Sequence, residues 1–303
     1  MKTQLAPRDL ALTLFVVTLF GFSFVPMKVG LREMPPFALC GLRFFFAAFP
    51  LVFFIRRPRI PWTFIAGYGL AIGVFQFGLL FLGMSLGMPA GLATLVIQVQ
   101  VFFTIGLGIW LLGDHLQRHN LIGAAFATIG LALLAIHKVD AGVGATLVGF
   151  ALVVGAAFAW AVGNIIAKRA AGAHQADMFA LVVWSALVPP LPLAVLSWLF
   201  ESGPAAWHAV GTASALAWAC VLFMAWGATL FGFGSWAGLM HRYPTALISP
   251  FALLIPVSGV ISGVLLLGET LAPMQMLGAL LIFAGLIENV YGPRLRAWLR
   301  RSS

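Results

Sequence analysis

The chain is poor in charge and poorest in acidic residues. Of its 303 residues only 8% are Asp, Glu, Lys or Arg, and 8 are acidic. A soluble domain usually carries about a quarter charged residues, so this composition excludes a protein that covers its surface with polar groups. Hydrophobic residues make up 62% of the chain. We therefore predict an all-α polytopic membrane protein.

Cysteine is equally scarce, which bears on metal and disulfide chemistry. Cys40 and Cys220 both lie in apolar runs, a pattern typical of small buried side chains rather than of a disulfide or metal site. The net charge of +9 is not gathered on a soluble module, so we expect no nucleic-acid partner. The expected partners are the lipid bilayer and a small-molecule substrate, with no cofactor, no metal and a functional monomer.

Ten apolar segments are long enough to cross a bilayer, which needs about 20 residues. They are Leu10–Val29, Pro36–Ile55, Phe64–Met84, Pro89–Leu112, His119–His137, Leu147–Ala167, Asp177–Leu199, Ala213–Gly238, Tyr243–Leu267 and Pro273–Tyr291. The uncharged run between Arg59 and Asp114 would be roughly 80 Å long as one helix, so it must turn back. Gly87 and Pro89 mark that turn.

The basic residues predict the topology. With both termini placed inside, 13 Lys and Arg residues flank the spans on the inner side and 3 flank them on the outer side. Basic residues concentrate on the cytoplasmic side of membrane proteins, so we expect cytoplasmic termini.

A sequence repeat divides the chain. Leu111–Leu116 returns as Leu266–Leu271, a spacing of 155 residues (266 − 111), and Gly123 and Gly130 match Gly278 and Gly285. We predict two five-helix repeats, 1–140 and 141–303, the second ending in a short basic C-terminal tail. Repeats of five spans must be inverted relative to each other, an architecture common among alternating-access transporters with a midplane site. The alternative is a duplication within another class of membrane protein.

The glycines of the repeat carry a prediction of their own. Gly123 and Gly130, like Gly278 and Gly285, are seven residues apart and share one helical face. Small residues on one face let two helix backbones approach closely. We therefore expect close helix packing within the monomer.

Several motifs resemble the EamA family of the drug/metabolite transporter superfamily. They are a Gly-Asp or Gly-Glu pair followed by Leu and a Gly-Ala pair, the stretch from Phe20 to Phe24 with Lys28, and Arg43 in the second span. The resemblance implies a ten-helix exporter in the bacterial inner membrane, with a central cavity between its repeats. The aromatic-rich composition most resembles the aromatic amino acid exporters of the YddG type. We predict a secondary transporter that exports aromatic and other neutral amino acids by alternating access; a multidrug or toxic-metabolite exporter is the alternative.

The predicted cavity residues are bulky or polar side chains within the spans. They are Phe24, Tyr68, Phe75, Gln76, Gln98, Trp160, Asn164, Trp226, Ser249, Pro250, Pro256 and Ser258. Asn164 either faces the cavity or joins two helices by a hydrogen bond. Trp226 lies near mid-span, away from the interfacial belt that tryptophans prefer. Carbonyls freed by Pro250 and Pro256 can receive a substrate ammonium, or the prolines simply kink the helix.

Three cations are assigned structural or gating roles. Lys28 and Lys168 lie at helix ends, where lysines extend toward the interface. Arg43 lies inside a span, with carbonyls or a substrate carboxylate as partners, and a structural role is favoured because the second helix need not line the cavity. Apart from Glu288, no acidic residue lies within a span, which argues against a proton-coupled exporter of lipophilic cations.

An enzyme is the remaining class. Asp114, His115 and His119 form the best candidate cluster, since two histidines four residues apart can share a metal. The matching stretch of the other half, around Glu269, has no histidine, and no third ligand is evident. We therefore expect no catalytic site.

Overall fold

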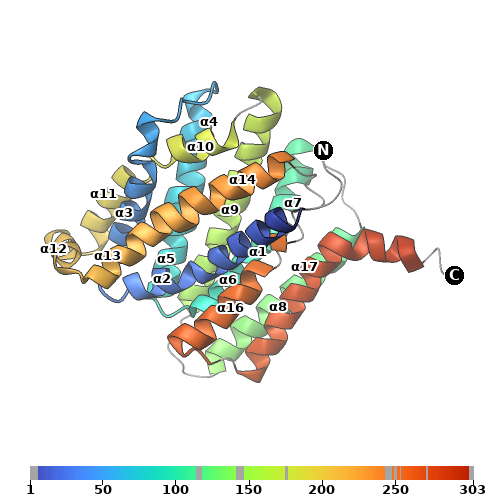
Figure 1. Cartoon of the computed structure of the whole chain (residues 1–303). Coiled ribbons are helices and arrows are strands. Elements are labelled where there is room, and N and C mark those ends of the chain that lie inside the picture. Colours follow the sequence, from blue (N-terminus) through green and yellow to red (C-terminus); the bar gives the residue numbers. More distant parts are fainter. Residues whose placement is uncertain are drawn as a thin grey trace.

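The computed structural model describes residues 6–113, 118–140, 147–174, 177–242, 248, 251–252, 254–270 and 272–299, and the regular structure in these ranges is helical (Figure 1). The α-helices are α1 (Pro7–Phe22), α2 (Phe24–Gly30), α3 (Pro36–Ala48), α4 (Trp62–Tyr68), α5 (Phe77–Ser85), α6 (Ala90–Val96), α7 (Gln100–Leu112), α8 (Arg118–Asp140), α9 (Leu147–His174), α10 (Met178–Ser185), α11 (Pro190–Phe200), α12 (Pro204–Thr212), α13 (Ala215–Leu222), α14 (Phe233–Arg242), α16 (Leu254–Leu267) and α17 (Pro273–Leu299). Short 3₁₀ turns occupy Leu51–Phe53 and Ile97–Val99.

Many of these helices join end to end into longer apolar rods. Within the described residues, seven rods are long and apolar enough to cross a membrane: Pro7–Gly30, Pro36–Phe53, Trp62–Ser85, Ala90–Leu112, Leu147–Gly172, Met178–Phe200 and Ala215–Trp236. Shorter apolar helices cover Leu121–Leu133, Leu254–Leu267 and Met276–Glu288. The all-helical, polytopic membrane class is therefore confirmed, while the count of ten spans stays a prediction.

Two segments outside the predicted spans are helical. The segment between the seventh and eighth predicted spans contains α12, which begins at Pro204. Proline suits the first turn of a helix because its missing N–H would have no partner there. The predicted C-terminal tail is also helical, because α17 continues to Leu299.

Two of the rods contain wider, π-helical segments that sequence analysis did not anticipate. Gly69–Gln76 lies between α4 and α5, and Phe223–Gly232 lies between α13 and α14. Adding the repeat spacing of 155 to the first segment gives residues 224–231, which fall inside the second. π-helical turns are rare and are often found at functional sites. These two segments approach the same central region of the molecule, as described below.

Glycines join α8 to α17, the helix pair at the lower right of Figure 1. A Cβ atom added to Gly130 would lie 2.6 Å from the carbonyl oxygen of Gly278. One added to Gly285 would lie 2.5 Å from the carbonyl oxygen of Gly123. The backbones are thus too close for any side chain at these positions. The prediction of close glycine packing within the monomer is confirmed.

The remaining helices form a bundle around a shared core. In this bundle α1 packs against α16, α2 against α13, α3 against α11, and α9 against both α5 and α7. One large cluster of buried apolar side chains joins most of these helices, from Phe24 in α2 to Met224 in the second π-helical segment, although α1 contributes none of its members. The bundle leaves a hollow at its centre, between α1, α3, α5, α9 and α14.

Candidate functional site

A cavity of ≈190 Å³ lies at the centre of the bundle. Its lining combines aromatic rings with a few polar groups: Phe20, Ser23, Phe24, Met27, Arg43, Gln76, Phe77, Leu80, Ile97, Gln98, Gln100, Trp160, Ala228, Phe233, Trp236, Ala252 and Ile255. A water molecule occupies about 30 Å³, so the cavity has room for a small organic molecule. Apolar walls with a few convergent polar groups are typical of small-molecule sites.

The cavity is closed at one end. Met27 and Leu80 line it where α2 and α5 approach their C-terminal ends, and each is only 1% exposed. Phe233 and Trp236 line it toward the opposite end and are only partly buried. The closed end is therefore the one where α2 ends and α6 begins.

At this closed end, three carboxylates accept hydrogen bonds from helix starts that are far away in the sequence. Glu269 accepts the N–H groups of Ala90 and Gly91, at 2.6 and 2.8 Å, at the start of α6. Glu201 likewise accepts from Phe37 and Ala38 at the start of α3, at 2.7 and 3.2 Å. A helix N-terminus carries unpaired N–H groups and partial positive charge, so each carboxylate stabilises the helix that it caps.

The third carboxylate, Glu33, caps α13. It accepts from the backbone N–H of Ser214 at 2.6 Å and from the Ser214 hydroxyl at 2.7 Å. Both bonds favour the ionised form and hold the pKa of Glu33 below its ordinary value. Nearby, Lys28 donates from Nζ to the Met84 carbonyl at 2.8 Å. The same end of the bundle is thus joined by several polar contacts between segments far apart in sequence.

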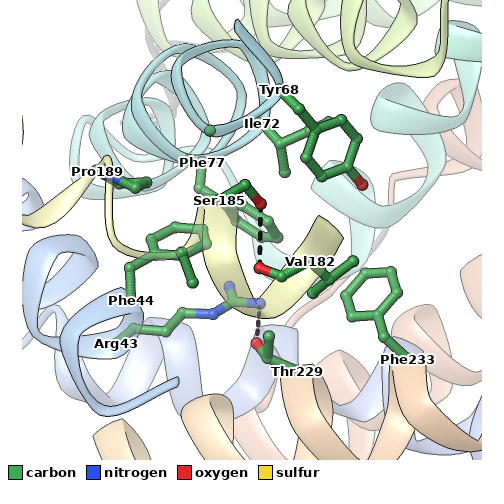
Figure 2. A pocket seen from close by; sticks show the side chains of 13 residues that line it. Arg43, Phe44, Tyr68, Ile72, Phe77, Val182, Ser185, Pro189, Thr229 and Phe233 are labelled. Atoms are coloured by element: carbon green, nitrogen blue, oxygen red, sulfur yellow. Dashed lines mark hydrogen bonds between the residues drawn. The ribbon is translucent and has the colours of Figure 1, made fainter. Parts of the chain in front are cut away.

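Arg43 lies between the central cavity and a second, much smaller one of ≈20 Å³ (Figure 2). It projects from α3 and is only 3% exposed. Its Nη2 donates to Thr229 Oγ1 at 3.2 Å, and its guanidinium carbon lies 3.9 Å from the centroid of the Phe77 ring. A structural role is favoured on sequence grounds because the second span need not line the cavity; in the structure this span does contribute, because Arg43 lines both cavities.

Six of the predicted site residues line a cavity. Phe24, Gln76, Gln98 and Trp160 line the central one together with Arg43, and Tyr68 lines the small one. They converge from five different predicted spans, while the placement of the site at the membrane midplane stays a prediction. Lys28, assigned a structural or gating role, lies at the closed end, where its Nζ donates to the Met84 carbonyl; the role itself stays a prediction.

Other predicted cavity residues lie elsewhere. Phe75 is 56% exposed and Trp226 is 47% exposed, and neither is among the lining residues. Asn164 donates to Gln100 Oε1 at 2.8 Å and to Thr104 Oγ1 at 3.1 Å, so it joins α9 to α7. Outward aromatics cannot be told from inward ones by residue type, because lipid and a cavity both accept them.

The proline-containing helix also differs from expectation. The Pro256 carbonyl accepts from Thr94 at 3.4 Å, which links α16 to α6. The Ser258 hydroxyl lies 3.0 Å from the Ile255 carbonyl of its own helix and 3.4 Å from the Val17 carbonyl of α1, so both residues contact neighbouring helices. Ser249 and Pro250 lie outside the described residues, as do Asp114 and His115. Lys168 is exposed on α9.

Sequence reasoning missed several lining residues, although some carried a signal. Phe20, in α1, lies one helical turn before Phe24, and Gln100 is a polar residue two positions after Gln98. Phe233 and Trp236 share the inward face of α14. Residues such as Met27, Leu80 and Ile97 carried no signal, since their side chains are equally suited to the core.

The helical membrane fold and the central cavity, closed at one end, define this molecule as a polytopic membrane protein with room for a small molecule. The EamA-like transporter family matches residues 9–136 and 147–290, and the chain belongs to that family. It is a transporter and not an enzyme. A "Probable amino-acid metabolite efflux pump" of Salmonella typhimurium is 44% identical over 97% of this chain and 99% of its own length.

Further similarities support the same class. A protein of Escherichia coli with the same description is 42% identical, covering 95% of this chain and 97% of its own. A solved crystal structure matches with a TM-score of 0.62 at 20% identity, over 93% of this chain and 96% of that one. At this identity the match supports the fold alone.

Proposed function

We propose that the chain exports amino acids, aromatic and other neutral ones, by alternating access around the central cavity. The observation that carries this is the lining of the cavity, which combines aromatic rings, glutamine amides and one arginine. An amino acid presents a carboxylate, an ammonium and a side chain, and these three kinds of lining group can receive them. The two efflux-pump relatives support the same substrate class.

The alternating-access mechanism rests on two inverted five-helix repeats, 1–140 and 141–303. The family match in two parts, 9–136 and 147–290, supports this division. The packing supports it as well. Exchanging the halves turns the contact between α1 and α16 into that between α9 and α7, and the contact between α2 and α13 into that between α9 and α4. The rods Pro36–Phe53 and Met178–Phe200 exchange with each other, as do α8 and α17, so the contact within each of these two pairs is kept.

In this account both termini face the cytoplasm of a bacterium and the closed end of the cavity faces outward. The excess of basic residues on the inner flanks, 13 against 3, supports that orientation. Reporter fusions at the C-terminus test it: a cytoplasm-active fluorescent reporter should light up and a periplasm-active phosphatase should stay inactive. The reverse pattern would contradict the orientation. The account needs one chain only, so a monomer should suffice for transport.

Transport itself is tested with purified protein in liposomes. Vesicles preloaded with unlabelled phenylalanine should accumulate labelled phenylalanine by exchange, and threonine should exchange as well. Empty liposomes give the background. A protein that moves none of the amino acids tested, yet moves lipophilic cations, is the multidrug exporter of the alternative hypothesis. Repeating the exchange with an imposed pH gradient shows whether protons are coupled to it.

A further inference from the structure

Arg43 is a buried cation for which the described part of the protein provides no acidic partner. Among the described residues that line the two cavities, it is the one with a charged side chain. Burying an isolated charge is costly unless it is paired, and an intramembrane arginine points to function by default. Arg43 therefore needs a negatively charged partner that the described residues do not supply.

The local contacts hold the guanidinium in place without neutralising it. The Thr229 hydroxyl donates its single proton to the Met224 carbonyl at 2.9 Å, which leaves its oxygen to accept from Arg43. The π-helical segment brings Thr229 and Met224, five residues apart, to this geometry. The Phe77 ring adds a cation–π contact. These contacts fix the direction of the guanidinium and leave its positive charge uncompensated.

The guanidinium also keeps unused hydrogen-bonding capacity. Arginine carries five N–H donors, and Nε of Arg43 is buried with no hydrogen-bond partner among the described residues. Because an unpaired buried donor is unfavourable, the donor is poised for a ligand. Carboxylates match the planar fork of a guanidinium with two parallel hydrogen bonds.

We infer that Arg43 binds the α-carboxylate of the transported amino acid and that the transporter thereby selects zwitterions over simple amines. This rests on the proposed function, which it extends from a substrate class to a binding mode. With the carboxylate at Arg43, the ammonium lies within the part of the cavity that Gln76 and Gln98 line. The side chain packs against aromatic walls such as Phe24 and Trp160. Thr229 is then a positioning residue that acts through Arg43.

The test compares ligands that differ only in their charged groups. Phenylalanine, 3-phenylpropanoate, which lacks the ammonium, and phenethylamine, which lacks the carboxylate, compete with labelled phenylalanine for exchange by the wild-type protein. Losing a hydrogen-bonded charged partner weakens binding by about ten- to a hundredfold. Phenethylamine should therefore compete about that much more weakly than phenylalanine, and 3-phenylpropanoate should remain a competitor. Equal competition by phenethylamine and phenylalanine would overturn the assignment without needing any variant.

Substitutions test whether the preference for phenylalanine over phenethylamine depends on Arg43. Arg43→Gln should bring the ratio of phenylalanine to phenethylamine affinity close to one, and Arg43→Lys should restore part of it because the positive charge returns. Arg57→Gln is the matched control, since Arg57 stacks on Trp62 at 4.8 Å and lines neither cavity. An Arg43→Gln protein that stays folded and keeps the wild-type ratio would refute the role of Arg43.

Failure of this inference and failure of the proposed function give different results. If no amino acid is exchanged by the wild type, the proposed function fails. Equilibrium dialysis of labelled 3-phenylpropanoate against detergent-solubilised wild type and Arg43→Gln still tests the anion site in that case. Binding by the wild type that Arg43→Gln abolishes supports the site, and equal binding by both refutes it.

Discussion

The carboxylate of Glu269 offers the sharpest structural perturbation at the closed end of the cavity. It accepts two backbone N–H groups at the start of α6, and two glycines make room for it. A Cβ atom at Gly91 would lie 3.1 Å from Glu269 Oε2, and one at Gly263 only 2.6 Å from the same atom. Glu269→Gln keeps the shape of the side chain but removes its charge, and its amide nitrogen can no longer accept a hydrogen bond.

The expected cost follows from these contacts. Gln retains one acceptor oxygen, so one charge-assisted bond is lost, worth about 1.5–3 kcal/mol. The favourable interaction of the charge with the helix N-terminus adds about 0.3–1 kcal/mol. We therefore expect Glu269→Gln to destabilise the closed-end conformation by about 2–4 kcal/mol. In a two-state alternating-access cycle such a cost shifts the population away from this conformation by at least about tenfold.

Two measurements check this prediction. Tryptophan fluorescence of the detergent-solubilised protein should show an apparent Tm several degrees below that of the wild type. A cysteine-reactive, membrane-impermeant label should reach a cysteine placed at Leu80 faster in the Glu269→Gln background than in the wild-type background. Glu33→Gln is the matched control, because Glu33 also accepts two hydrogen bonds at a helix start, from Ser214 of α13, but lies on the exposed surface and should matter less. An unchanged Tm and unchanged labelling for Glu269→Gln would refute the reasoning.

Two further predictions concern stability. Gly130→Ala should destabilise the pair of α8 and α17 by about 1–3 kcal/mol because its Cβ would meet the Gly278 carbonyl oxygen at 2.6 Å. Gly106→Ala is the control, because this helical glycine has nothing within 4 Å, and it should leave the Tm unchanged or raise it. An equal loss of Tm in both variants would contradict the close packing of α8 and α17. The lowered pKa of Glu33 means that its cap stabilises the folded protein above the ordinary glutamate pKa of about 4.3 and stops doing so as the pH falls through the lowered value. The Tm difference between wild type and Glu33→Gln should thus be present at neutral pH and vanish in acid, and a difference that persists in acid would contradict the assignment.

Much of the fold could be predicted because lipid imposes a simple pattern on the sequence. Spans such as Trp62–Ser85 and Ala90–Leu112 stand out by their lack of charge, and prolines mark several helix starts, as Pro36 does for α3. The seven-residue spacing of the glycines in α8 and α17 also predicted that these two helices pack closely. The π-helical segments could not be predicted in this way. They differ from an α-helix only in whether each backbone N–H bonds the carbonyl five residues earlier instead of four, and the apolar sequence does not indicate this.

The site was less predictable because orientation within a span depends on packing. Gln76 and Gln98 were found from their polarity, which lipid does not tolerate. Polarity alone misplaced Asn164, whose amide is satisfied by Gln100 and Thr104 on a neighbouring helix. Arg43 was recognised as unusual, but its position between two cavities follows from how α3 packs beside the second π-helical segment.

The central claim is that amino acids cross through this cavity, and two tryptophans test it most directly. Trp160 lines the cavity, whereas Trp226 faces outward and donates to the Phe46 carbonyl at 3.1 Å. The measurement is phenylalanine exchange in proteoliposomes by Trp160→Ala and Trp226→Ala at equal protein content. Loss of a large apolar contact corresponds to about tenfold in affinity, so Trp160→Ala should slow exchange at subsaturating phenylalanine by about that factor while Trp226→Ala stays near the wild type. Equal rates in the two variants, or a larger loss in Trp226→Ala, would contradict the account.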